Sequence, residues 1–446
     1  MKKISLILAC LCSISLIYAQ APKTKKAIVI IVDGIPADVK EKVSTPFIDA
    51  VSQIGGYTRA TMGGEKSGYS QTPTISAVCY TSMITGTWGN KHNVWDNGLE
   101  DPNYNYWTMF RFLKNDQKDK KIGIYSTWLD NRTKLIGEGL PQTEHLKFDY
   151  HYDGYELDTV RFPHDKQSKY INNIDEEIVK EASQSIRKDA PDFSWVYLQY
   201  TDDIGHHFGD SPEMEKAVQI ADRQVGDLFA AVQYREQYYN EDWMFVVITD
   251  HGRDVATGES HGGQTDRERG IWIATNKKEL NKHFYAHTPE IVDILPSMAR
   301  HLGVNISKEQ QYELDGVPFV GEVSIAHPKA MLKDDSLILS WTSLQKNDKV
   351  KILVSGTNNF KHQGVKGNDK YIDLGEFEQS SGAVKVKLPK ELKDSKMLKV
   401  VFEGKVLPAP LAGQRVEQGS PRRRLPLWCG PDGAVFSPTR RPGRWQ

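Results

Sequence analysis

The chain has 446 residues, of which 39% are hydrophobic and 26% are charged, and its formal net charge is -1. This length exceeds one small core and predicts a main domain of about 250–300 residues with a smaller addition. The near-neutral charge excludes the large basic field by which a protein attracts nucleic acid or anionic lipid.

The first residues predict export. Two lysines precede an apolar run from Ile4 to Tyr18, which ends at Ala19. This pattern is typical of a secretory signal peptide, here residues 1–19, and predicts a secreted or periplasmic protein. No segment reaches the ~20 apolar residues of a membrane-spanning helix, so we expect no transmembrane anchor. A lipid anchor at Cys10 or Cys12 is the alternative, although the residues before each cysteine fit an acylation site poorly.

Residues 26–325 alternate short β-branched runs with longer helical patterns. This alternation predicts an α/β fold with a mostly parallel central sheet flanked by helices. The expected strands are Ala27–Val32, Ile122–Ser126, Ser194–Tyr200, Met244–Thr249 and Gly270–Thr275. The expected helices include Ile174–Lys188, Pro212–Val232 and Pro289–Leu302.

Two further segments follow this domain. Residues 326–406 contain short alternating runs and predict a small antiparallel β domain. Its expected strands are Ser336–Trp341, Val350–Val354, Tyr371–Leu374, Val384–Leu388 and Met397–Phe402. Residues 407–446 are rich in Pro, Gly and Arg without apolar periodicity, so we expect a disordered tail, which a frame-shift or chimeric end would also explain.

Three predicted strands end in an acidic residue, namely Asp33, Asp202 and Asp250. Strand carboxyl ends line the ligand crevice of an open α/β sheet. Three carboxylates in one crevice repel one another unless cations are present, which points to a metal site. A single aspartate at a strand end would be explained equally well by a turn or a helix cap.

Histidines accompany these aspartates. His206 follows Asp202 by four residues, His251 is adjacent to Asp250, and His261 lies ten residues further on. Imidazole nitrogen and carboxylate oxygen are both ordinary zinc ligands. Any one of these histidines alone would more often be a surface or hydrogen-bonded core residue.

A nucleophilic hydroxyl is expected in the stretch that contains Thr74 and Ser76. It precedes an apolar segment, Ala77–Ile84, that resembles a helix and stops at Gly86. A serine at a helix start faces the positive end of the dipole and free backbone N–H groups, which favour an alkoxide and a phosphoryl oxygen. The plain alternative is that Ser76 only caps the helix.

Over about residues 26–321, these motifs in this order resemble the alkaline phosphatase superfamily, in particular its nucleotide pyrophosphatase/phosphodiesterase branch. The resemblance implies an alkaline phosphatase-like fold and two divalent metal ions, with zinc as the expected metal. For the first ion it implies the ligands Asp202, His206 and His261. For the second it implies Asp33, Asp250, His251 and the nucleophile Ser76.

The family's spacing selects the nucleophile. It places this residue ten positions before the Gly of a Thr-Gly pair, and counting back from Gly86 gives Ser76. Threonine is usual there, and the family has Pro-Asn-His where this chain has Val78-Cys79-Tyr80, so Thr74 is kept as the reserve nucleophile. An asparagine about twenty residues further on binds the transferred phosphoryl group in the family, which implies that role for Asn97.

The resemblance implies hydrolysis of phosphodiester or pyrophosphate bonds through a covalent phospho-Ser intermediate. The substrate would be a small phosphate ester such as a nucleotide, and the oligomeric state is not indicated. Trp128 is expected to contribute to an apolar slot for the second substituent of a diester, although an aromatic residue is more often core.

Three other functions are alternatives to this one. An alkaline phosphatase-type phosphomonoesterase uses the same bimetallic centre, and Arg132, Arg267 and Arg269 would suit its dianionic substrate. A sulfatase needs a C/S-x-P-x-R motif, which neither the Ser76 nor the Cys79 neighbourhood supplies. A catalytically inactive binding protein would be expected to have lost at least one of the six Asp and His ligands, and all six are present.

Overall fold

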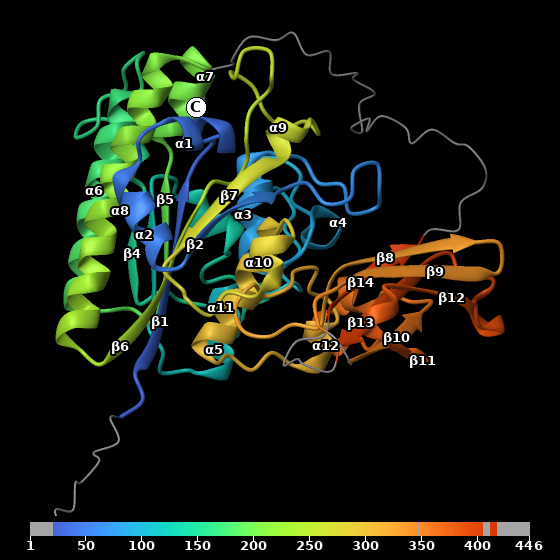
Figure 1. Ribbon diagram of the computed structural model, residues 1–446. Coiled ribbons are helices and arrows are strands. Elements are labelled where there is room, and N and C mark those ends of the chain that lie inside the picture. The colour runs from blue at the N-terminus through green and yellow to red at the C-terminus, as the bar shows by residue number, and fades with distance from the viewer. Residues whose placement is uncertain (1–20, 346–347, 405–410, 417–446) are drawn as a thin grey trace, which may run out of the picture.

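The computed structural model describes residues 21–345, 348–404 and 411–416, the last six as backbone only. The chain forms an α/β part around a seven-stranded sheet and a C-terminal part with two smaller antiparallel sheets, which lie side by side in Figure 1. The expected fold class is confirmed.

The central sheet has the strand order β2-β7-β6-β1-β5-β3-β4. Five strands from β6 to β4 pair in parallel, whereas β7 runs antiparallel to both of its neighbours, so the sheet is mixed. The strands are β1 (Thr24–Val32), β2 (Gly56–Thr61), β3 (Ile122–Ser126), β4 (Tyr150–Tyr152), β5 (Phe193–Leu198), β6 (Glu241–Ile248) and β7 (Gly270–Thr275). The sequence did not predict β2 and β4, which are short edge strands with few fully buried residues.

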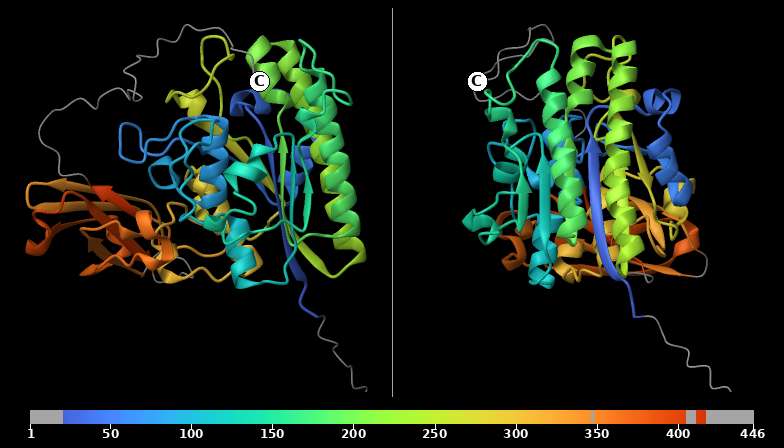
Figure 2. Two further views of the ribbon diagram at one scale, coloured as in Figure 1. Left: turned by 180° about the vertical axis from the view of Figure 1, so that it is seen from behind. Right: turned by 90° about the vertical axis from the view of Figure 1, so that its left-hand side faces the viewer.

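Strand β1 is buried on both sides because helices cover both faces of the sheet. Ala27, Val29 and Ile31 belong to one core cluster, and Ile28 and Ile30 belong to the other. Two long helices, α6 (Lys169–Lys188) and α8 (Pro212–Tyr238), cover the face formed by Ile28 and Ile30 and stand beside the sheet in both views of Figure 2. A continuous apolar run is therefore what this central position requires.

The helices divide between these two cores. One face carries α3 (Ser76–Thr85), α5 (Met109–Asp116) and α11 (Ile294–Leu302). The other carries α2 (Pro46–Ile54), α6 (Lys169–Lys188) and α8 (Pro212–Tyr238). The other α-helices of the described residues are α1 (Ala37–Lys42), α4 (Gly89–His92), α7 (Tyr200–Phe208), α9 (Asp266–Arg269), α10 (Lys282–Ala286), α12 (Lys308–Gln311) and α13 (Asn359–Gln363).

Asp202 lies within a helix and not at a strand end, which corrects the sequence prediction. Strand β5 ends at Leu198, and α7 begins at Tyr200. The carboxylate of Asp175, on α6, accepts hydrogen bonds from the backbone N–H groups of Gln199 and Tyr200, at 3.2 and 2.9 Å. This anchor turns the chain from strand to helix immediately before Asp202.

The C-terminal part consists of two antiparallel sheets, in the orders β11-β10-β13-β14 and β12-β9-β8. Side chains of both sheets pack into one core cluster, as in a sandwich. The strands are β8 (Ile325–Lys333), β9 (Ser336–Ser343), β10 (Lys349–Ser355), β11 (Ile372–Glu378), β12 (Ala383–Lys387), β13 (Leu398–Gly404) and β14 (Leu411–Val416).

Strand β14 differs from the expected disorder of residues 407–446. Its backbone pairs antiparallel with β13, because the edge of that sheet offers unpaired N–H and C=O groups to a further segment. The remainder of the tail, at 407–410 and 417–446, lies outside the described residues. So do the expected signal peptide at 1–19 and the alternative lipid-anchor cysteines.

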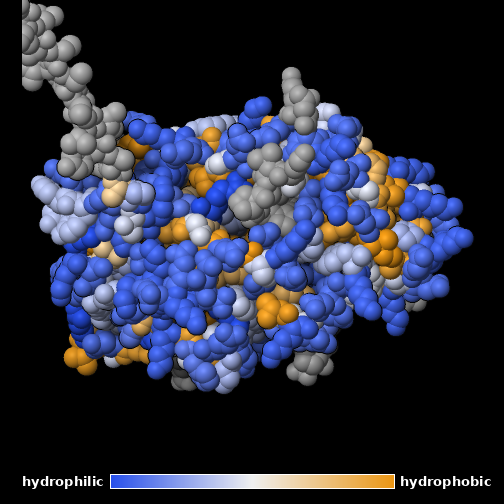
Figure 3. All heavy atoms as spheres, turned by 90° about the horizontal axis from the view of Figure 1, so that it is seen from below, coloured by the Kyte–Doolittle hydropathy of each residue, from blue (hydrophilic) through white to orange (hydrophobic). Residues whose placement is uncertain are grey.

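Hydrophilic residues cover most of the face in Figure 3, and hydrophobic residues form separate patches between them. Such single patches are ordinary on a surface that faces water. Within the described ranges, no helix has the length and apolar character needed to cross a membrane.

Candidate metal centre

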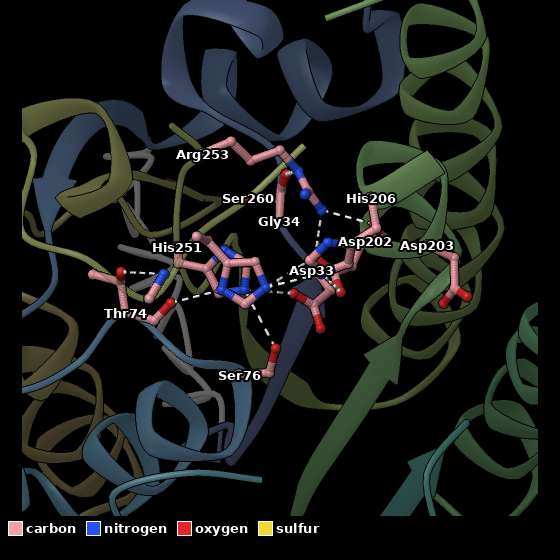
Figure 4. Close-up of polar contacts among 12 residues, drawn as sticks. Asp33, Gly34, Thr74, Ser76, Asp202, Asp203, His206, His251, Arg253 and Ser260 are labelled. Atoms are coloured by element: carbon pink, nitrogen blue, oxygen red, sulfur yellow. Dashed lines mark hydrogen bonds and ion pairs between the residues drawn. The ribbon is translucent and has the colours of Figure 1, made fainter. Parts of the chain in front are cut away.

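Six Asp and His side chains from distant parts of the sequence form two adjacent groups, and Figure 4 shows four of them, Asp33, Asp202, His206 and His251, pointing toward one another. Each offers a ligand atom within 4.8 Å of the others in its group. The first group is Asp202, His206 and His261, and the second is Asp33, Asp250 and His251. The structure thus brings together all six Asp and His residues that the sequence predicts as ligands, in the two expected groups of three.

The second group is almost completely buried. His251 Nε2 lies 3.2 Å from Asp33 Oδ1 and 3.4 Å from Asp250 Oδ2. Neither carboxylate oxygen has a hydrogen-bond partner among the described residues. Burial raises the pKa of Asp250 well above its usual range, and the negative charge of Asp33 adds to this effect. A divalent cation would satisfy both oxygens and reverse this penalty, so the donor set fits a metal.

The other oxygens of these carboxylates are held by the protein. Asp33 Oδ2 accepts hydrogen bonds from the hydroxyls of Tyr80 and, at 2.7 Å, Tyr197. Asp250 Oδ1 accepts one from the backbone N–H of Gly34, at 3.1 Å. Partners of this kind orient metal-ligating carboxylates and leave the opposite oxygen free.

Two residues of the first group are spaced by about one helical turn. Asp202 and His206 lie four residues apart on α7 and therefore share one face, with Oδ2 and Nε2 separated by 3.3 Å. His261 Nε2 lies 3.0 Å from His206 Nε2 and 3.7 Å from Asp202 Oδ1. Three donors at this separation suit a single metal ion.

Arg253 supports Asp202 from the side. Its buried guanidinium contacts Asp202 Oδ1 and the Asp202 carbonyl oxygen, the latter at 2.8 Å, and donates from Nε to the Gly34 carbonyl at 3.0 Å. Burial raises the pKa of Asp202, but the charges of Arg253 and His206 outweigh it and hold that pKa well below its usual range. Gly205 is required here, because a Cβ at this position would lie 2.1 Å from Arg253 Cζ.

The two groups adjoin through stacked imidazoles. The ring centroids of His251 and His261 are 3.7 Å apart, with 14° between the ring planes. Nδ1 of His251 lies 2.9 Å from the Gly252 carbonyl, and Nδ1 of His261 lies 2.8 Å from the Thr74 carbonyl. Each Nδ1 therefore carries a hydrogen, which leaves both Nε2 lone pairs available to metals. Burial, followed by the charge of His251, lowers the pKa of His261 to about 3.

Ser76 lies at the second group. It is the first residue of α3, and its Oγ is 3.3 Å from His251 Nε2. Ile75 is the N-cap residue and its side chain forms no cap hydrogen bond, so Ser76 does not have the plain capping role. Its hydroxyl is instead placed beside the candidate ligands.

Asn97 supplies the missing cap. Its Oδ1 accepts a hydrogen bond from the Ala77 N–H, at 3.0 Å. This contact fixes the orientation of the side-chain amide, because the N–H can only donate to the oxygen. The Ala77 N–H is consequently engaged and is not free for a phosphoryl oxygen, contrary to the expectation for this helix start.

The hydroxyl of the reserve nucleophile Thr74 is engaged in two hydrogen bonds with the protein backbone. This buried hydroxyl donates to the Gly263 carbonyl and accepts from the Gly262 N–H, both at 3.0 Å. The Thr74 carbonyl also holds His261, as described above. Thr74 thus fixes the loop that carries His261, which favours Ser76 as the nucleophile.

The residues predicted to contact substrate lie in different environments. Trp128 is half-buried and packs against the core cluster that contains α3, so its proposed role in a slot stays a prediction. The three arginines suggested for a monoester all have structural partners. Arg132 binds Asp153 and Glu138, Arg267 binds Asp38 and Asp210, and Arg269 donates to the carbonyls of Met62 and Gly64.

Sequence reasoning missed Arg253, Tyr80 and Tyr197. The position of Arg253, directly after the Thr-Asp-His-Gly motif, was a usable signal, because a buried charge next to metal ligands needs a partner. Tyr80 lies on α3 one helical turn after Ser76, which also suggested the same face. Tyr197 is an ordinary strand residue in the sequence and carried no signal.

The sequence matches the model of one known protein family. The sequence profile described as type I phosphodiesterase / nucleotide pyrophosphatase matches residues 27–267, which is more than half of the chain. No curated protein is similar enough to count as a match.

Several solved structures resemble the fold. Murine ectonucleotide pyrophosphatase/phosphodiesterase 5, solved with AMP, is 14% identical, with 63% of this chain and 95% of that chain covered and a TM-score of 0.44. Phosphonoacetate hydrolase from Sinorhizobium meliloti is 15% identical, with 52% and 57% covered and a TM-score of 0.36. Ps i-CgsB, solved with a neocarrahexaose, is 15% identical, with 71% and 84% covered and a TM-score of 0.48. Likeness at this level does not indicate the substrate.

Proposed function

The chain belongs to the type I phosphodiesterase / nucleotide pyrophosphatase family, and from this premise we propose that it is an exported two-metal phosphodiesterase that uses Ser76 as its nucleophile. The observation that carries the proposal is the position of Ser76 Oγ, 3.3 Å from His251 Nε2. The same nitrogen lies 3.2 and 3.4 Å from two buried carboxylate oxygens that have no hydrogen-bond partner among the described residues. Export rests on the predicted signal peptide at residues 1–19.

The chain's residues would hold two divalent ions in the groups described above, and zinc suits their Asp and His donors. When bound, these ions lower the pKa of a hydroxyl and of water and neutralise charge on the phosphoryl group. The carboxylates Asp33, Asp202 and Asp250 supply three negative charges to balance them.

Hydrolysis would proceed in two displacements. Ser76 Oγ loses its proton to solvent and forms a bond to phosphorus, while the bond to the leaving alcohol breaks in line and the leaving oxygen takes a proton from water. A water molecule then attacks the phosphoserine, which restores the Ser76 hydroxyl and releases a phosphate monoester. Each step conserves atoms and charge without a redox partner.

Asn97 is positioned to assist both displacements. The hydrogen bond from the Ala77 N–H to Oδ1 fixes the orientation of the amide, and the amide nitrogen, which forms no hydrogen bond with the described residues, would donate to a phosphoryl oxygen next to Ser76. A donor that is fixed before the reaction stabilises the developing charge without reorganisation.

A diester fits the surroundings better than a monoester does. Arg132, Arg267 and Arg269, the cations suggested for a dianionic substrate, are engaged by carboxylates or carbonyl groups of the protein. A monoester would need additional positive charge at the site, whereas a diester carries a single negative charge on its phosphate. The substrate is thus expected to be a small phosphodiester or pyrophosphate, such as a nucleotide derivative.

The proposal is tested by hydrolysis of bis(p-nitrophenyl) phosphate and p-nitrophenyl phosphate, using the mature chain with added zinc. We expect faster turnover of the diester, and a loss of at least ~10³-fold in Ser76→Ala. Ser82→Ala, a change to another buried serine of α3, is the matched control and should retain activity. Preferential turnover of the monoester would instead assign the phosphomonoesterase alternative, and cleavage of neither ester would reject the substrate class.

Thr74→Val separates a nucleophile from a positioning residue. The change removes the two hydrogen bonds to the His261 loop, so we expect weaker zinc binding and activity that recovers as zinc is raised. Activity that stays absent at saturating zinc, in a folded variant, would transfer the nucleophilic role to Thr74.

A further inference from the structure

A second histidine cluster lies away from the candidate metal centre. A cavity of about 910 Å³ is lined by residues of both the α/β part and the C-terminal sheets, and none of the six Asp and His ligands lines it. His283 and His287 line it from α10 and the residue after that helix, and His327 lines it from β8. In Figure 1, α10 lies on the side of the α/β part that faces β8.

His283 is prepared as a ligand. Its side chain is 1% exposed, and its Nε2 lies 2.7 Å from Asp293 Oδ2. Asp293 also accepts hydrogen bonds from the N–H groups of Glu290, at 2.7 Å, and Val317, at 2.6 Å, so it acts as an acceptor throughout. Nε2 therefore carries the hydrogen, and Nδ1 keeps its lone pair. That Nδ1 is buried and has no hydrogen-bond partner in the part of the chain that the structure describes. A histidine oriented by a carboxylate is typical of a metal site.

His327 is aimed into the same cavity by an irregular backbone. Its φ is +47°, although Pro328 follows it and such a residue prefers extended conformations. The pairing of β8 with β9 shifts register between Ala326 and Lys329, and His327 lies in this bulge. Its Nε2 lies 3.1 Å from the Thr288 carbonyl, so Nε2 donates and Nδ1 remains available.

The spacing of the rings suits a shared ion. The ring centroids of His283 and His327 are 5.1 Å apart. Two imidazoles on one tetrahedral zinc ion, with Zn–N bonds of about 2.1 Å, place their centroids about 5 Å apart. The His287 centroid lies 6.4 Å from that of His327, and the nitrogen atoms of the three rings do not all lie within 4.8 Å of one another. The half-buried His287 ring would therefore move inward by about 1 Å to complete three ligands.

We propose that His283, His287 and His327 bind one further divalent transition-metal ion, of the zinc class, which links the α/β part to the C-terminal sheets. Three protein ligands leave the fourth position of a tetrahedral ion open to the cavity. The site is independent of the proposed hydrolytic activity, because it shares no residue with the two groups around Ser76.

The test compares zinc bound per chain, by elemental analysis after dialysis, in the mature wild type and two variants. His283→Gln keeps an N–H donor toward Asp293 but loses the Nδ1 ligand, and His327→Asn tolerates the positive φ but removes the imidazole. We expect each variant to bind one zinc fewer than the wild type. His362→Asn, a change at an exposed histidine of the C-terminal part, should bind the same amount as the wild type.

Thermal unfolding gives a second measurement. Added zinc should raise the wild-type Tm more than that of either variant, because a ligand that binds only the folded state stabilises it. Equal zinc content in the wild type and both folded variants would overturn the proposal, whatever the count at the centre near Ser76. A missing zinc with unchanged phosphodiester turnover would support it and show that the two sites are separate.

Discussion

Asp33 illustrates how single residues shape the candidate centre. Its Oδ2 is held by Tyr80 and Tyr197, which leaves Oδ1 directed at the second group. In Tyr80→Phe the ring remains and one hydrogen bond is lost. We expect affinity for the second zinc ion to fall by about 10–100-fold, as for other partners of metal ligands, measured by competition with a chelator.

Tyr125→Phe is the matched control for this prediction. Tyr125 is equally buried, and its hydroxyl binds Ser185 Oγ at 2.6 Å on the opposite face of the sheet. Zinc affinity should be unchanged in Tyr125→Phe. If both variants bind zinc as tightly as the wild type, then Tyr80 only fills space, and the orientation of Asp33 depends on Tyr197 alone.

At the scale of the element, helix α3 must stop sharply so that the chain can turn away from the core. Gly86 ends it with φ of +64°, and an added Cβ would lie 3.3 Å from Leu295 Cβ and Leu314 Cδ2. We expect Gly86→Ala to lower the free energy of unfolding by about 2–3 kcal/mol, from left-handed strain and crowding together. Urea unfolding measures the change.

Gly303 offers the comparison, because it ends α11 with a similar φ of +68° and nothing lies within 4 Å of an added Cβ. Gly303→Ala should therefore cost only the left-handed strain, about 1 kcal/mol. Equal losses in the two variants would show that crowding against Leu295 and Leu314 contributes nothing.

The burial of each strand and helix explains which elements could be predicted from the sequence. The buried strands β1, β3 and β7 were recognisable because both of their faces pack against helices, which demands continuous apolar runs. The edge strand β2 was not, because its exposed face leaves no such run. The sequence predicts Asp202 as a metal ligand but places it at a strand end, because the helix start at Tyr200 depends on Asp175, a contact distant in sequence. The support given by Tyr197 and the blocking of Thr74 likewise depend on tertiary packing.

At the scale of the whole molecule, neutral buried histidines make folding sensitive to acid. His92 is fully enclosed; the Val94 N–H donates to its Nδ1 at 3.1 Å, and its Nε2 lies 3.0 Å from Ser82 Oγ. Nδ1 thus accepts and Nε2 carries the hydrogen, which defines a neutral ring. Burial lowers the pKa of His92 to about 3, from 6.5 for the free side chain.

The sign of the effect follows from proton uptake. Between pH 6.5 and about 3 the unfolded chain binds a proton at His92 that the folded chain does not, so stability is complete above pH 6.5 and falls as the pH is lowered. At pH 5 the loss from this residue is about 2 kcal/mol. His92→Asn keeps an acceptor for the Val94 N–H without an ionisable ring, so its urea midpoint should fall less than that of the wild type between pH 7 and pH 5, in metal-free protein. His145→Asn, at an exposed ring, controls for the substitution, and identical pH slopes in the His92 variant and the wild type would refute the argument.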